Sequence, residues 1–181
     1  LRGLAHLGDL DLEVEVLAAE RDLLAQLATL LDDKPEPILA AEREAGRIRI
    51  VLLHHPVADG AVRWRKALAD RAALCDVLRR EGPELVLHGH ARDARFDATA
   101  GPQAPIPCLC VPSSSALPNP RDEGARWHRL TLSCAGGACC ADVEVRRWST
   151  DAQAFVPGGG YRLRLPRRAA ATAAPSRALP G

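Results

Sequence analysis

Four of the six histidines lie in two pairs, His54 with His55 and His88 with His90. Each pair lies at the C-terminal end of a short apolar run of the kind that forms a strand buried on both faces. Ligands of open α/β sheets bind in the crevice outside the carboxyl ends of the strands, and imidazole nitrogen is a good ligand for zinc, iron and similar ions. A single histidine beside a strand is usually a hydrogen-bonded structural residue, but two pairs at one sheet edge indicate a metal site.

The elements that must position these histidines follow a strand–helix–strand order. The run R-I-R-I-V-L-L-H-H at residues 47–55 predicts one buried strand, and Pro56 ends it because proline cannot donate to a sheet ladder. Apolar residues at helical spacing predict a helix over residues 68–80, which ends at Gly82-Pro83. Residues 84–88 predict the second strand. This order is typical of a βαβ crossover and of a layered α/β architecture.

Further elements flank this unit. An amphipathic pattern predicts a helix over residues 16–31, which two prolines then end. Shorter strands are expected at residues 108–111, 126–133 and 141–148. The last two are joined by the turn A-G-G-A and should form a hairpin. We expect one domain over residues 1–165 and a disordered Ala/Arg/Pro tail over residues 166–181.

Composition excludes several classes of function. The 181 residues suit one domain or most of a larger one. With 24 basic and 23 acidic residues, the net charge of +1 argues against a nucleic-acid binder. No apolar stretch is long enough to span a membrane, and there is no basic-then-apolar leader. The chain contains no methionine and begins with Leu1, so we expect a fragment, a processed product or a misplaced start.

The six cysteines do not form a disulfide scaffold pattern in a chain of this length. Cys108 and Cys110 would share one face of a strand as buried small residues. Cys134, Cys139 and Cys140 flank the A-G-G-A turn, so a cross-hairpin pair is geometrically allowed. Their spacing matches no standard zinc pattern. We expect free thiols, a reducing compartment and a cytoplasmic location.

The segment V-L-L-H-H-P-V, followed by L-V-L-H-G-H-A-R, resembles the C-terminal half of a calcineurin-like metallophosphoesterase. The resemblance extends over residues 23–148 and includes the helix D-R-A-A-L-C-D-V-L-R-R and the later P-S-S-S-A-L. It implies a layered α/β sandwich of the metallophosphoesterase type, here an incomplete C-terminal portion with a terminal β-hairpin.

The resemblance also implies roles for individual residues. In that family two divalent metals, bound by five short motifs, polarise the phosphoryl oxygens and activate the attacking water. His54 and His90 match metal ligands, His55 would be a catalytic neighbour on the substrate side, and Gly89 would permit the tight turn that aims His90. Arg92 replaces the last histidine of Gly-His-x-His. It would bind a phosphate oxygen of the substrate or face solvent.

The Asp-x-His, Gly-Asp-x-x-Asp and Gly-Asn-His motifs of the family are absent. Two imidazoles cannot fill two sites that each want about four to six donors, and loop carboxylates such as Asp59, Asp93 and Asp97 are more typical of turns. The expected function is therefore a metal-dependent phosphoester hydrolase, a phosphatase or phosphodiesterase, that is weak or inactive as the isolated chain. Its cofactors would be divalent Mn, Fe or Zn, weakly bound.

Two alternatives stand beside this function. One is a pseudoenzyme or interaction module, and the other is a non-functional remnant of such an enzyme. The expected partners are a phosphoester small molecule and either a missing N-terminal half or a second copy of the chain, with no nucleic acid and no membrane.

Overall fold

The computed structural model describes residues 12–16, 35–58, 70–91, 93–116, 119, 124–135 and 137–166, the first of these ranges by its backbone alone. Residues 17–31 of the helix expected in the N-terminal region, Arg92, Asp59 and nearly all of the expected C-terminal tail lie outside this set. Among the described residues, no helix has the length and apolar character needed to cross a membrane.

The expected strand–helix–strand unit is confirmed. Strand β2 (Ile50–Leu53), helix α3 (Arg71–Glu81) and strand β3 (Leu85–His88) follow one another, and the two strands pair in parallel. Helix α3 ends at Gly82, which adopts a left-handed conformation and donates its N–H to the Leu78 carbonyl. A second helix, α2 (Pro35–Glu44), precedes β2.

Two further strands complete this mixed sheet. Strand β5 (Ile106–Cys110) pairs in parallel with β3, and β4 (Arg95–Thr99) pairs antiparallel with β5, so the order is β2-β3-β5-β4. Strand β4 was not predicted; its R-F-D-A-T sequence has Phe96 as its one large apolar side chain. Phe96 is 58% exposed at the sheet edge, so the strand lacks a buried stripe that periodicity could detect.

The second sheet is antiparallel, in the order β1-β6-β7-β8. The expected hairpin is confirmed as β6 (Arg126–Ala135) and β7 (Ala138–Ser149), both longer than predicted. Strand β1 (Leu12–Val16) pairs with β6, and β8 (Ala154–Leu165) forms the far edge. Strand β8 was not predicted because Pro157 and three glycines interrupt it. Proline is tolerated in a strand at a sheet edge.

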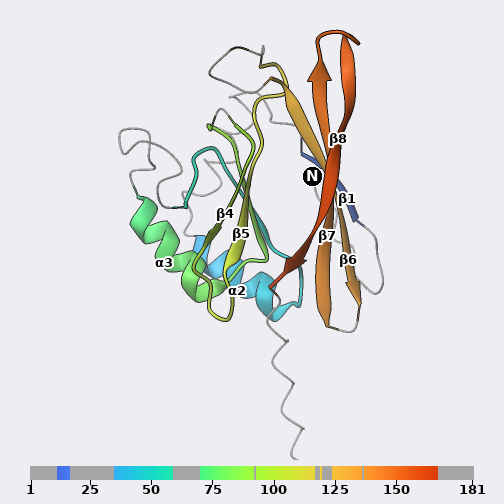
Figure 1. Ribbon diagram of the computed structural model, residues 1–181. Helices are drawn as coiled ribbons and strands as arrows, with labels where there is room; N and C mark the ends of the chain where they lie inside the picture. The colour runs from blue at the N-terminus through green and yellow to red at the C-terminus, as the bar shows by residue number, and fades with distance from the viewer. Residues whose placement is uncertain are drawn as a thin grey trace, which may run out of the picture.

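The elements form three layers: the helices, the mixed sheet and the antiparallel sheet (Figure 1). One apolar core lies between the two sheets, and its members include Leu87, Leu109, Leu130 and Val143. A second core joins the helices to the mixed sheet through Leu39, Leu78, Val86, Ile106 and Cys108. Strands β3 and β5 are buried at every residue because both of their faces are covered, whereas β6 and β7 alternate.

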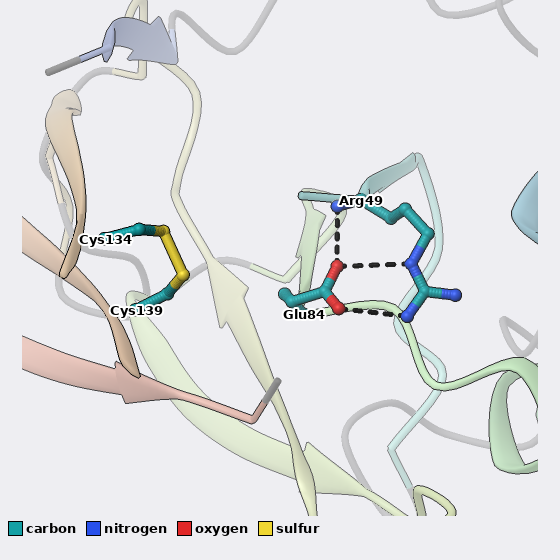
Figure 2. The surroundings of a disulfide bond; sticks show 4 residues. All are labelled: Arg49, Glu84, Cys134 and Cys139. Atoms are coloured by element: carbon teal, nitrogen blue, oxygen red, sulfur yellow. Dashed lines mark hydrogen bonds and ion pairs between the residues drawn. A yellow bond between two sulfur atoms is a disulfide. The ribbon is translucent and has the colours of Figure 1, made fainter. Parts of the chain in front are cut away.

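Cys134 and Cys139 form a disulfide across the β6–β7 hairpin (Figure 2). The expectation of free thiols is wrong for this pair. The tight turn sets the two residues directly opposite each other, with 4.2 Å between their Cα atoms. Gly137 supplies the positive φ of +81° that this turn requires. Four other cysteines, Cys75, Cys108, Cys110 and Cys140, are free.

A buried ion pair between Arg49 and Glu84 joins the start of β2 to the segment before β3 (Figure 2). The remaining guanidinium donors reach backbone carbonyls of Leu39 in α2 and of Glu81 and Gly82 at the end of α3. This one side chain therefore connects both helices to the mixed sheet.

Candidate metal centre

The candidate site lies where β2 and β3 end. His54 and His55 follow the last residue of β2, and Pro56 prevents the strand from continuing. His90 lies two residues beyond the end of β3. Leu53 and His88 are partners in the parallel register, so the carboxyl ends of these two strands are adjacent. Strand pairing therefore brings together histidines that are well separated in the sequence.

His54, His55 and His90 form one group of imidazoles at the surface. Each offers a ring nitrogen, and these ligand atoms all lie within 4.8 Å of one another. The His90 Nδ1 and His54 Nε2 atoms are 3.1 Å apart. The ring centroids are separated by 4.7 Å for His54–His55, 4.9 Å for His54–His90 and 4.5 Å for His55–His90. The two residues that the resemblance implied as ligands are thus neighbours, with His55 equally close.

His88 does not join this group. It is the last residue of β3, it shares a strand face with Val86, and only 5% of it is exposed. Its Nδ1 lies 3.2 Å from the Gly89 carbonyl oxygen, and burial lowers its pKa. Alternation along a strand would place residues 88 and 90 on the same face. They are separated because His90 lies beyond the strand end, in the turn closed by Ala91 and Gly89.

The surroundings of His55 favour its neutral form. Partial burial, with a smaller contribution from the neighbouring His54, lowers the pKa of His55 below its usual value. A neutral imidazole is the form that coordinates a metal. His55 therefore has a free electron pair over a wider pH range than an exposed histidine does.

The turn that carries His90 differs from the expectation. His90 itself has a φ of +66°, whereas Gly89 is not among the residues with positive φ. The Ala91 N–H donates to the Gly89 carbonyl over 2.9 Å. A hydrogen bond from residue i+2 to residue i around a positive central φ defines the rare and strained form of the γ-turn. The positive φ of this turn therefore belongs to His90 and not to Gly89.

No carboxylate belongs to the histidine group in the part of the chain that the structure describes. Asp93 lies 3.7 Å from Arg95, and Asp97 belongs to β4, where it pairs in register with Cys108. The donor set consequently consists of three imidazoles. That number suits one tetrahedral ion with a fourth position left for water or substrate, and it is too small for two ions.

Comparison with known proteins adds little. No protein-family model matches the chain, and no curated protein matches it. Among solved structures, a single mutant of Vps29 from Entamoeba histolytica aligns with 15% sequence identity and a TM-score of 0.35. The alignment covers 64% of this chain and 54% of that one, so the match spans about half the length of Vps29. A TM-score this low does not establish a shared fold.

Proposed function

We propose that this chain is a metal-dependent phosphoester hydrolase in which His54, His55 and His90 hold one divalent transition metal ion. The observation that carries the proposal is the convergence of three imidazoles, with ligand atoms within 4.8 Å of one another, at the carboxyl edge of parallel strands. Catalytic zinc sites commonly use three protein ligands and leave a fourth position open. The reaction class comes from the resemblance of H-H-P and G-H-A-R to metallophosphoesterase motifs.

The donor set favours some metals over others. Imidazole nitrogens suit zinc and iron, whereas magnesium, calcium and manganese prefer oxygen donors. We therefore rank zinc and iron ahead of manganese. Because three imidazoles serve one ion, we expect slower turnover from this chain than from a two-metal site.

Each residue of the site would have a separate role. His54 and His90 supply one nitrogen each from two adjacent strand ends, so the sheet fixes their separation. His55 supplies the third nitrogen, and partial burial lowers its pKa, which favours the neutral form that coordinates a metal. We assign Arg92 the contact with a phosphate oxygen, since a guanidinium binds phosphate with two parallel hydrogen bonds. When bound, the ion supplies Lewis-acid polarisation of the phosphoryl oxygen.

The test compares metal content and hydrolysis in the same preparations. The wild-type chain, His54→Ala, His90→Ala and a His6→Ala control are loaded with zinc or iron and dialysed. Metal is then counted by mass spectrometry, and hydrolysis of p-nitrophenyl phosphate and bis-p-nitrophenyl phosphate is measured. We expect one ion per wild-type and control chain and none in the other two, with hydrolysis following the metal. Hydrolysis that is equal in all four proteins would overturn the proposal.

A second candidate is a metal-binding interaction module without catalysis. The described residues add no carboxylate and no fourth histidine to the group, which favours this alternative. It predicts stoichiometric metal binding with no phosphoester hydrolysis in the experiment above, so the two candidates give different results.

A further inference from the structure

The turn at the end of β3 is held in place from the neighbouring strand. Residues 89–91 close on themselves through the Ala91 N–H and the Gly89 carbonyl, and they force a positive φ on His90. Non-glycine residues remain in such conformations only when the surrounding structure enforces them. Some group outside the turn must therefore stabilise it.

Cys110, the last residue of β5, contacts this turn. It is 1% exposed and pairs in parallel register with His88. Its Sγ donates to the Gly89 carbonyl oxygen over 3.4 Å. Burial raises the pKa of the thiol to about 11, so the sulfur keeps the proton that it donates. The Cys110 thiol thus contacts the carbonyl of the residue that directly precedes His90, the same carbonyl that closes the turn.

One further contact fixes the end of β5 against this turn, and another constrains the turn from β3 itself. The Val111 N–H donates to the His88 carbonyl over 3.2 Å, which continues the β3–β5 pairing to the point where the turn begins. The His88 Nδ1 lies 3.2 Å from the Gly89 carbonyl oxygen, the same atom that accepts the thiol hydrogen. The Gly89 carbonyl is therefore the point through which buried side chains constrain the turn.

We propose that Cys110 is a positioning residue of the histidine centre, whose thiol holds residues 89–91 so that the His90 ring stays beside His54. The inference rests on the proposed function, since it assigns a role within the same metal site. Cys110 is not a ligand in this proposal: its sulfur contacts the backbone of the turn, and the group of ligand atoms in the described part of the chain contains histidines alone. Groups that orient metal ligands typically change metal affinity by about 10–100-fold when they are removed.

The strand itself provides a matched control. Cys108 lies two residues earlier on the same face of β5, is fully buried, and donates to the Ile106 carbonyl of its own strand over 3.6 Å. Cys108→Ala and Cys110→Ala remove the same sulfur atom from the same strand. Only Cys110 contacts the turn that carries His90. A general loss of packing would affect both variants, whereas loss of positioning would affect one.

The first measurement is a titration of both variants with Co²⁺, followed by visible absorption. We expect Cys110→Ala to weaken cobalt binding by about 10–100-fold and Cys108→Ala to leave the Kd unchanged. Cys110→Ser keeps a donor for the Gly89 carbonyl and should restore much of the affinity. Thermal unfolding of the metal-free proteins shows whether Cys110→Ala folds. If it does not, Cys110→Ser takes its place as the test variant. Equal weakening in the Cys108 and Cys110 variants overturns the proposal.

The second measurement needs no metal. Imidazole ¹⁵N and ¹H NMR signals of His54 and His90 are recorded in the metal-free wild type and in both alanine variants. We expect the signals to move in Cys110→Ala and to stay in place in Cys108→Ala. A wild-type chain that binds no cobalt overturns the metal centre. The NMR comparison then decides separately whether Cys110 sets the position of His90, and unmoved signals in Cys110→Ala refute that role.

Discussion

Glu84 accepts three hydrogen bonds from Arg49, one of them from the backbone. The Arg49 N–H and Nε–H donate to Oε2 over 2.6 and 3.2 Å, and a terminal nitrogen donates to Oε1 over 2.9 Å. The Arg49 side chain is 3% exposed and that of Glu84 is 4% exposed. Both charges are therefore fully removed from water and compensate each other, and each depends on the other for its stability in the interior.

Removal of one partner of this pair should destabilise the chain strongly. We expect Arg49→Met to lower the free energy of unfolding by about 3–5 kcal/mol, because Glu84 is left as an uncompensated buried charge. The double variant Arg49→Met/Glu84→Leu should lose much less. Urea unfolding at pH 7 measures both. The exposed pair Arg79–Asp76 is the control, and Arg79→Met should change stability by less than about 1 kcal/mol. Equal losses for the single and double variants would contradict this expectation.

His128 should make the chain sensitive to acid. It is 3% exposed, and neither ring nitrogen has a hydrogen-bond partner in the described part of the chain. Burial, aided by the nearby Arg126, lowers its pKa from 6.5 to about 4. The unfolded chain takes up a proton below pH 6.5 while the folded chain stays neutral, so stability is complete above pH 6.5 and falls toward pH 4. The loss by pH 4 should be about 3 kcal/mol.

The measurement is urea unfolding of the wild type and His128→Leu at several pH values between 7 and 4. Leucine cannot take up a proton and leaves no buried ring nitrogen without a partner. Between pH 7 and pH 4 the unfolding free energy of His128→Leu should therefore fall by about 3 kcal/mol less than that of the wild type. Identical pH profiles for the two proteins would show that other groups cause the acid sensitivity.

The Cys134–Cys139 disulfide should add a modest and specific stabilisation. The two cysteines are separated by 5 positions in the sequence, so the bond closes a short loop, which corresponds to about 2 kcal/mol. We expect tris(2-carboxyethyl)phosphine to lower the unfolding free energy of the wild type by this amount and to leave Cys134→Ala/Cys139→Ala unaffected. Thiol counting in denaturant gives an independent check, since reduction should add two thiols to the wild type and none to the variant.

Two roles are open to His55, a third metal ligand or a residue on the substrate side, and experiment can distinguish them. If it is the third ligand, His55→Ala should weaken zinc binding by more than the roughly 10–100-fold typical of groups outside the ligand set. If it acts on the substrate side, as the family resemblance implied, zinc affinity should hold while turnover falls. Isothermal titration beside a hydrolysis assay distinguishes the two, and we expect the loss of affinity. Zinc binding should also weaken in acid, because protonated imidazole cannot coordinate a metal.

The sequence predicted the parts of the molecule that depend on local pattern. Buried apolar runs located β2, β3 and β5, and the residues after two of these runs indicated that His54 and His90 would converge. The edge strands β4 and β8 were not predicted because neither carries a continuous buried stripe. The Arg49–Glu84 pair and the contact of Cys110 with the Gly89 carbonyl join residues that only tertiary packing brings together. The hydrophobic periodicity of the sequence carries no information about such contacts.

Adjacent residues of β3 belong to different cores. The Leu87 side chain contributes to the core between the sheets, and that of Val86 contributes to the core beneath the helices. Leu109 and Cys108 repeat this arrangement in β5. The central strands are therefore shared by both layers, and neither layer can separate without exposing one face of β3 and β5. The described three-layer body should consequently melt in a single cooperative transition. Substitutions that disrupt either core should also change the positions of the histidines at the ends of those strands.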